Sequence, residues 1–476
     1  MKVMLIYCKE GFNGYLPLGI AYIAAFLKKN RHTTKCIDTS IYSSLQEIKN
    51  IIDNEKSDVY GLSVMTPYFG LGMSLSHYIR RKYPSSKIIW GGPHATVRPK
   101  EILTSGNVDY VIPGEGEDIF NEVLNHYDNI GDVPGIAYLN SDDELIINSR
   151  KGFIEDLDSL PFPERSLFEI NRYIKFNNEN KLHILFSRGC PFSCTYCQPT
   201  LNRIFGKKVR YRSPENVIEE IKYLVGKYNV DNFSFNDDTL TVNRNKFMKF
   251  CDLLLTSGIK IQWRFNSRAD TIDKEMMLTA VKSGASSVHI GVESGNDYIR
   301  ETVYKKGIHR DQIISVFNTA RKVGINAHAY FMVGAPDETI SMVGDTANLI
   351  KRIKPEKMQL SKTIPLPGTY LYHVFKEMGL KAEAEASEYI YTKTLITWGT
   401  NKLTQLQKER LYQAILLEYS LSLKKAFLAV FSPPFKVAKI LNFAYLLARV
   451  FLPFKIVNKL WLIFLTPFSS YNKNNQ

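Results

Sequence analysis

Short apolar runs alternate with stretches of helical pattern through the first part of the chain. The apolar runs span 2–8, 33–38, 58–65 and 87–92. Strands that are apolar throughout are typical of a parallel sheet covered by helices on both faces, because neither face meets water. The pattern therefore predicts a doubly wound, Rossmann-like α/β domain, which we place at residues 1–140.

A proline-rich stretch follows this domain. Pro161 and Pro163 lie within "DLDSLPFPERSLFEINRYI" and interrupt any continuous helix there. We expect residues 141–174 to form a linker that packs across a domain junction.

A second and more regular alternation of strands and helices begins at residue 181. The helix "PENVIEEIKYLVGKY", between the first two strands, should be capped by Ser213 and Pro214. This series predicts an open, partial (β/α)6 barrel within residues 175–400. The six expected strands span 181–187, 231–236, 259–265, 286–292, 326–333 and 356–362.

The last segment, 401–476, combines apolar runs with basic residues. From residue 421 onward it contains no Asp or Glu, and none of its apolar runs reaches the roughly 18 residues of a membrane span. We expect basic amphipathic helices that contact the cytoplasmic face of a membrane peripherally. The alternative is a helical subdomain that covers the barrel mouth with a solvated basic edge.

Composition narrows the class of protein further. The chain has 476 residues, is 45% hydrophobic and 23% charged, and carries a net charge of +14. These values predict a globular protein of two or three domains. The basic residues of the tail alternate with aliphatic runs, so we expect no nucleic-acid partner. Six unevenly spaced cysteines and a first segment that resembles a strand, not a leader, favour a cytoplasmic protein.

Ligands of doubly wound sheets bind beyond the carboxyl ends of the strands. Three such ends in the first domain carry small or polar residues, although ordinary turns between strand and helix would also account for them. No G-x-G-x-x-G follows the first strand, so a dinucleotide is not favoured. The candidate ligand-binding residues here are Ser63, Thr66, Gly91, Gly92, His94 and Glu115.

Every expected strand of the barrel ends in polar, charged or glycine residues, although a purely structural barrel needs none. A helix cap would explain Asp237 or Asp238 taken alone, but not the whole rim. Active sites of such barrels gather at this rim. In chain order the strand-end residues are Cys190, Cys194 and Cys197, then Asn236, Asp237 and Asp238, then Asn266 and Arg268, then Glu293 and Ser294, then "GAPDE" at 334–338 and "PLPGT" from Pro365.

The three clustered cysteines in "SRGCPFSCTYCQ" point to a metal cluster. Structural zinc is closed by four ligands, and no second cysteine pair follows this one. A [4Fe–4S] cluster held by three thiolates keeps one iron open for another ligand. We expect the remaining cysteines, Cys8, Cys36 and Cys251, to be buried small hydrophobic residues.

The C-x3-C-x-aromatic-C run at the start of a barrel resembles the signature of the radical S-adenosylmethionine (SAM) superfamily. The resemblance implies that Cys190, Cys194 and Cys197 hold a [4Fe–4S] cluster whose open iron binds SAM, with Tyr196 near the adenine. "NDD" replaces the usual Gly-Gly-Glu, so Asp237 or Asp238 would contact the methionine amino group. The resemblance also implies ribose contacts at Glu293 and Ser294. Arg268 is expected to bind the methionine carboxylate, because a guanidinium can grip a carboxylate through two hydrogen bonds.

"GLSVMT", "WGGPHAT" and "VIPGEGE" before this barrel resemble the cobalamin (B12)-binding domain of class B-like radical SAM enzymes. The motif D-x-H-x-x-G is absent, as in the subgroup that uses no histidine in place of the lower base, and some relatives have lost cobalamin. The resemblance implies that a SAM-derived radical activates a carbon that cobalamin then methylates, with oxidative cyclisation or carbon–carbon bond formation as the alternative.

The partners follow from the same resemblance and from the tail. We expect an external electron donor such as ferredoxin or flavodoxin, and a small-molecule or lipid substrate that is hydrophobic. Transfer RNA modification would require an RNA-binding module, and none is evident. A simple electron carrier would not need polar, charged or glycine residues at every strand end.

Overall fold

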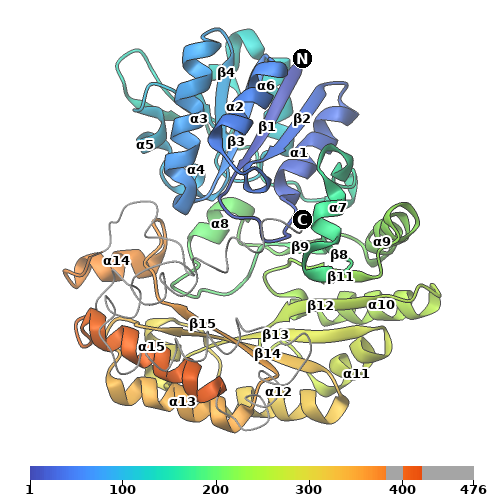
Figure 1. Cartoon of the computed structure of the whole chain (residues 1–476), viewed down its shortest axis with the longest axis vertical. Helices are drawn as coiled ribbons and strands as arrows, with labels where there is room; N and C mark the ends of the chain where they lie inside the picture. Colours follow the sequence, from blue (N-terminus) through green and yellow to red (C-terminus); the bar gives the residue numbers. More distant parts are fainter. Residues whose placement is uncertain (382–399, 421–476) are drawn as a thin grey trace, which may run out of the picture.

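The computed structural model describes residues 1–381 and 400–420. In Figure 1 the first domain stands above a second, open sheet, and short elements fill the junction between them. The strands of both sheets end near this junction, so the two sets of strand ends predicted to bind ligands approach one another.

The first sheet has the order β2-β1-β3-β4-β5-β6-β7 in the described part of the chain. The first five of these strands pair in parallel, which confirms the predicted doubly wound domain. The sequence pattern did not predict the antiparallel hairpin β6/β7, which carries the sheet beyond residue 140. The strands are β1 (Lys2–Cys8), β2 (Thr33–Asp38), β3 (Val59–Val64), β4 (Lys87–Gly91), β5 (Tyr110–Val111), β6 (Ala137–Leu139) and β7 (Leu145–Ile147).

Helices cover both faces of this sheet, which explains its uninterrupted apolar strands. Val3 and Leu5 of β1 pack with α1 and α6, whereas Met4 and Ile6 pack on the other face with α2, α3 and α5. The helices of this domain are α1 (Leu18–Lys29), α2 (Leu45–Asn54), α3 (Phe69–Lys82), α4 (Pro93–Val97), α5 (Pro99–Leu103) and α6 (Glu117–Asn125).

The second sheet has the order β15-β14-β13-β12-β11-β8, and all of its pairings are parallel. Because β8 and β15 form its two edges, it is an open half barrel, as the sequence predicted. Ser213 caps α9 as expected, with its side chain accepting a hydrogen bond from the Asn216 N–H. The strands are β8 (Lys181–Ile184), β11 (Asn232–Phe235), β12 (Gln262–Ser267), β13 (Ala285–Glu293), β14 (Asn326–Val333) and β15 (Lys357–Lys362).

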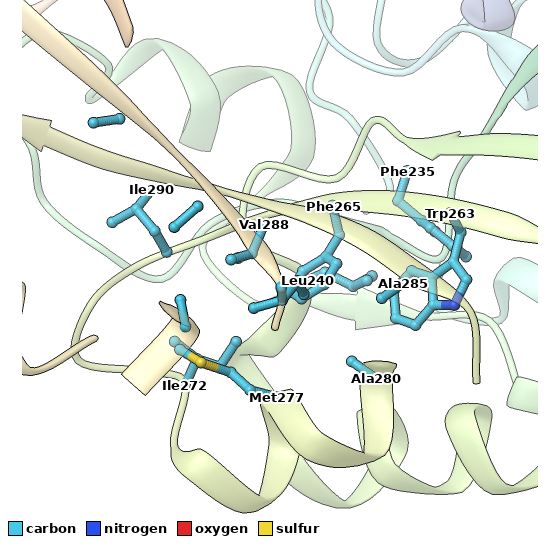
Figure 2. Packing of buried hydrophobic residues seen from close by; sticks show 14 of the residues in the cluster. Phe235, Leu240, Trp263, Phe265, Ile272, Met277, Ala280, Ala285, Val288 and Ile290 are labelled. Carbon is cyan, nitrogen blue, oxygen red and sulfur yellow. The ribbon is translucent and has the colours of Figure 1, made fainter. Parts of the chain in front are cut away.

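Helices cover the outer face of the half barrel and form its hydrophobic core. Alternate strand residues supply that core, among them Phe235, Trp263, Phe265, Val288 and Ile290, and Figure 2 shows them beside the underlying helices. The residues between them therefore lie on the inner, concave face. The outer helices are α9 (Pro214–Tyr228), α10 (Arg244–Thr256), α11 (Lys274–Lys282), α12 (Arg310–Val323) and α13 (Ile340–Ile353).

Short elements complete the junction and the carboxyl-terminal part. Helices α7 (Ile170–Ile174) and α8 (Thr200–Phe205) and the strand pair of β9 (Ser187–Arg188) and β10 (Arg210–Tyr211) lie between the sheets. Helix α14 is Tyr370–Glu377, and α15 (Gln405–Ser420) packs beside α13 and β15.

Only the beginning of the tail belongs to the described residues. There, Leu403 and Ile415 join the outer core of the half barrel. The predicted membrane-contacting helices lie mostly within 421–476, outside the described residues. Among the residues that are described, no helix is long and apolar enough to cross a membrane.

Candidate active site at the junction of the two domains

The cysteine loop follows β9 and faces a cavity of about 210 Å³ at the carboxyl ends of the barrel strands. Cys190, Cys194 and Cys197 all line this cavity, and none of them forms a disulfide. Thr195 anchors the loop, because its N–H donates to Tyr304 O at 2.9 Å and its hydroxyl donates to Val303 O at 2.8 Å.

The three thiols all face one cavity, which suits a [4Fe–4S] cluster in which each thiolate takes a different iron. Burial raises the pKa of the Cys190 and Cys197 thiols, so ligation must displace their protons. Cys8, Cys36 and Cys251 are buried elsewhere, as predicted.

A buried triad closes the other side of this cavity. Lys306 Nζ lies 2.8 Å from Glu293 Oε1 and 3.1 Å from the Tyr196 hydroxyl, which itself donates to Glu293 at 3.1 Å. Burial acts to lower the pKa of Lys306, but the Glu293 carboxylate outweighs it, and the pKa is raised. The ammonium therefore stays charged. Sequence reasoning found Tyr196 and Glu293 but missed Lys306, which lies in a loop with no motif of its own.

The structure separates the two neighbouring aspartates. Asp238 lines the cavity, and burial raises its pKa to about 6. Asp237 instead accepts hydrogen bonds from the N–H groups of Phe186 and Ser187, so it holds the backbone that leads into the cysteine loop. Burial likewise raises the pKa of Asp237 to about 6. Of the two, Asp238 is the residue placed to contact a ligand.

Arg268 and Ser294 occupy positions that the sequence did not predict. Arg268 lines the cavity, but it already grips Asp270 through Nε at 2.9 Å and Nη2 at 2.8 Å. Its remaining amino group, Nη1, lies 3.7 Å from Cys194 Sγ. The expected two-bond grip on a ligand carboxylate is thus taken by Asp270. Ser294 is fully buried beside Thr346 and does not line the cavity, so its predicted ribose contact is not supported.

A second cavity, of about 360 Å³, lies at the strand ends of the first domain. Ser63, Gly91 and Gly92 line it as predicted, and its other walls are mainly apolar. Gly19 of α1 opens onto it with free space where a side chain would stand. Such an apolar cavity over glycines, at the carboxyl ends of parallel strands, fits the body of a corrin.

Helix α8 covers this second cavity from the side of the half barrel. Leu201, Ile204 and Phe205 supply the cover. A Cβ on Gly114 would stand 3.2 Å from Arg203 O, so glycine at this position permits the close approach of α8. Leu201 also lines the cysteine cavity. The two cavities therefore share one side chain as a common wall.

Two of the predicted first-domain residues do not line the cavity. His94 Nδ1 pairs with Thr66 Oγ1 at 3.2 Å, and burial lowers the pKa of His94 to about 4. The pairing leaves His94 Nε2 without a hydrogen-bond partner, and the predicted contact of His94 and Thr66 with a ligand stays a prediction. Their neighbours in the sequence gave no sign that the two side chains would pair with each other.

Glu115 lines the cavity, but its carboxylate belongs to an ion-pair network across the domain junction. It accepts from Arg188 at 2.8 Å and from Arg210 at 2.8 and 2.9 Å, while Arg188 also donates to Glu117 at 2.6 Å. Burial acts to raise the pKa of Glu115, but Arg210 and Arg188 outweigh it, and the pKa is lowered. The carboxylate thus connects the domains, and its predicted contact with a ligand stays a prediction.

Two separate parts of the chain match known families. Residues 184–350 match the radical SAM superfamily, and residues 11–124 match the B12 binding domain. The chain belongs to the cobalamin-dependent radical SAM enzymes. The cofactors of this enzyme are a [4Fe–4S] cluster, SAM and cobalamin.

Curated relatives resemble the chain over most of its length, and a solved structure shares its fold. An uncharacterised methyltransferase of Pyrococcus horikoshii is 29% identical over 75% of this chain and 77% of its own length. The anaerobic magnesium-protoporphyrin IX monomethyl ester cyclase of Rubrivivax gelatinosus is 27% identical over 77% of this chain and 67% of its own. The structure of the radical enzyme OxsB with aqua-cobalamin and SAM bound has the same fold, with a TM-score of 0.73 at 17% identity over 98% of this chain and 75% of that one.

Cys190, Cys194 and Cys197 are the residues that would hold the cluster, with Asp238, Tyr196, Glu293 and Lys306 around SAM. The glycines at 19, 91 and 92 and the cover of α8 would enclose cobalamin. When bound, the cluster and SAM supply a 5′-deoxyadenosyl radical, and cobalamin supplies a methyl carrier. The protein's own contribution is to bind and orient these groups in two adjoining cavities.

Proposed function

We propose that this enzyme methylates an unactivated carbon atom of a small molecule. The observation that carries the proposal is the shared wall at Leu201, which lines both the cysteine cavity and the cavity of the first domain. Hydrogen abstraction and methyl transfer must reach the same substrate carbon, and adjoining cavities meet that requirement without a large domain movement.

The side chains around the cysteine cavity support this chemistry by positioning. Lys306 and Glu293 fix the Tyr196 ring through buried hydrogen bonds, and Asp238 offers a carboxylate to a ligand's amino group.

Oxidative cyclisation, or carbon–carbon bond formation within one substrate, is the second candidate. It is favoured by the relative in Rubrivivax gelatinosus, whose name is that of a cyclase. The relative in Pyrococcus horikoshii, whose name is that of a methyltransferase, favours methylation. In both cases we propose a hydrophobic metabolite or lipid as substrate and ferredoxin or flavodoxin as electron donor.

The test is anaerobic reconstitution of the cluster, followed by SAM and dithionite. We expect 5′-deoxyadenosine to form. Its absence with an intact cluster would contradict the proposed radical reaction. Deuterium-labelled methyl-SAM, added with cobalamin and an extract of small molecules, then separates the two candidates. Methylation transfers the label into a new product, whereas cyclisation yields an unlabelled product that has lost hydrogen.

A further inference from the structure

The inner face of the half barrel is polar where its outer face is apolar. Strand pairing aligns its residues in three rows across the sheet. Closed parallel barrels fill this space with Val, Ile and Leu, whereas this one presents groups that form hydrogen bonds. From the amino ends of the strands upward, the rows are His183, Ser234, Arg264, Ser287 and Asn326, then Asn266, His289, His328 and Lys357, then Gly291, Tyr330 and Gln359.

The second and third rows continue into the cysteine cavity. His289 and Tyr330 line that cavity and are joined to each other at 2.8 Å, and the His328 ring stacks on His289 at 4.5 Å. The second and third rows therefore connect the cysteine cavity with the first row of the inner face. Successive rows stand about 7 Å apart along the strands.

His183, in the first row, is a buried polar side chain without a hydrogen-bond partner. Its exposed fraction is 1%, and neither ring nitrogen has a hydrogen-bond partner. Tyr15, from the first domain, stacks on this ring at 4.3 Å. Burial lowers the pKa of His183 to about 3, so the ring is neutral and offers one N–H. An unpaired buried donor costs free energy unless a ligand meets it.

Positive charge surrounds the same row. Arg264 stands two strands from His183, with Ser234 between them. Arg264 and Lys181 share a single carboxylate partner, Glu179, so this cluster of four groups with His183 carries more positive than negative charge. The row thus combines a neutral N–H, a hydroxyl and a guanidinium, a set of donors suited to anionic oxygens.

We propose that His183, Ser234 and Arg264 bind an anionic end group of the substrate, a carboxylate or phosphate, while the rest of the substrate extends along the inner face toward the cysteine cavity. This inference rests on the proposed function, since it describes the molecule on which that reaction acts. The substrate class is an organic anion rather than a neutral hydrocarbon, and the first row determines specificity by holding its charged end.

The test compares three probes that share one apolar chain: laurate, dodecyl phosphate and dodecan-1-ol. Their binding to the full chain with its reconstituted cluster is measured by calorimetry, without SAM or reductant. We expect at least one anion to bind about 10-fold more tightly than the alcohol. The tighter of the two anions identifies the end group as carboxylate or phosphate.

Two variants test the assigned residues. Arg264→Met removes the charge, and His183→Phe keeps the ring against Tyr15 but removes both nitrogens; each should abolish most of the preference for the anion. Arg244→Met, on the outer helix α10, makes the same change of charge away from the inner face and should preserve it. Equal binding of anion and alcohol, or an unchanged preference in both inner-face variants, would overturn the proposal.

Failure of the proposed function has a different signature. Because the probes bind without SAM, an intact preference for anions combined with no 5′-deoxyadenosine formation would reject the radical reaction and leave the anion site standing. Formation of 5′-deoxyadenosine without any preference for anions would reject the anion site alone.

Discussion

Arg188 donates a 2.8 Å hydrogen bond to Glu115. This bond joins the first domain to the strand that leads into the cysteine loop. Both side chains are buried, and Arg188 lies two residues before Cys190 in the chain. The contact therefore ties the position of the cluster loop to the position of the domain that faces it.

We expect Arg188→Met to lower the free energy of unfolding by about 3–5 kcal/mol, because it takes the ion-pair partner from the buried Glu117 carboxylate and one of the two arginines from Glu115. Urea titration with tryptophan fluorescence measures this loss. Lys208→Met is the matched control, since Lys208 pairs with Glu155 on the surface, where such pairs contribute less than about 1 kcal/mol. Equal losses in the two variants would show that burial of the Arg188 pair has no special effect.

Substitution of Cys194 by alanine should remove the cluster and with it the cleavage of SAM. Iron and sulfide content per chain, together with 5′-deoxyadenosine formation, provide the measurement. Cys251→Ala is the control, because Cys251 is buried in the outer core and should leave both values unchanged. A cluster retained in full by Cys194→Ala would refute the assigned ligand.

The neighbouring aspartates should respond differently to the same change. Asp238→Asn is expected to raise the KM for SAM about 10-fold, because it removes a charged partner from the cavity. Asp237→Asn should instead lower the free energy of unfolding by about 1–3 kcal/mol, since Asp237 accepts two buried backbone N–H groups. Steady-state kinetics and thermal unfolding distinguish the two, and a reversed pattern would contradict their placement.

A leucine at Gly19 should fill the second cavity and block cobalamin. Gly19 and Gly70 both lie in the first turn of a helix of the first domain with open space around them, but only Gly19 lines the cavity. We therefore expect Gly19→Leu to fold and to lose most of its bound cobalamin, measured by absorbance per chain. Gly70→Leu should retain it, and equal retention by both would place cobalamin elsewhere.

Acid should destabilise the protein through His183. Its pKa falls from 6.5 to about 3 on folding, so the unfolded chain binds a proton between these values and the folded chain does not. The stability associated with this group is present above pH 6.5 and is lost as the pH falls toward 3. Between pH 6.5 and 5 the loss amounts to at most about 2 kcal/mol. Urea titrations of His183→Phe should show a shallower fall than wild type, and identical slopes would contradict the assignment.

The sequence was sufficient to predict the two sheets and the cysteine site, because the patterns that indicate them lie within short segments of the chain. Continuous apolar strands marked the doubly wound domain, and three closely spaced cysteines marked the cluster loop. The hairpin β6/β7 was missed because its strands are only three residues long, too short for any periodicity to appear.

Other features depended on contacts between distant parts of the chain. Lys306 meets Glu293 only after the half barrel forms, and Glu115 meets Arg188 and Arg210 only across the domain junction. The roles of Asp237 and Asp238 could not be separated either, since they follow the end of β11, where strand alternation no longer determines which side chain faces the cavity.

The stacking of Tyr15 on His183 has an evolutionary consequence. Tyr15 belongs to the first domain, which would hold cobalamin, whereas His183 belongs to the half barrel. The proposed substrate site therefore has one wall in each domain. An exchange of the first domain between relatives would therefore alter substrate choice as well as cofactor affinity. The two domains are therefore expected not to behave as interchangeable modules.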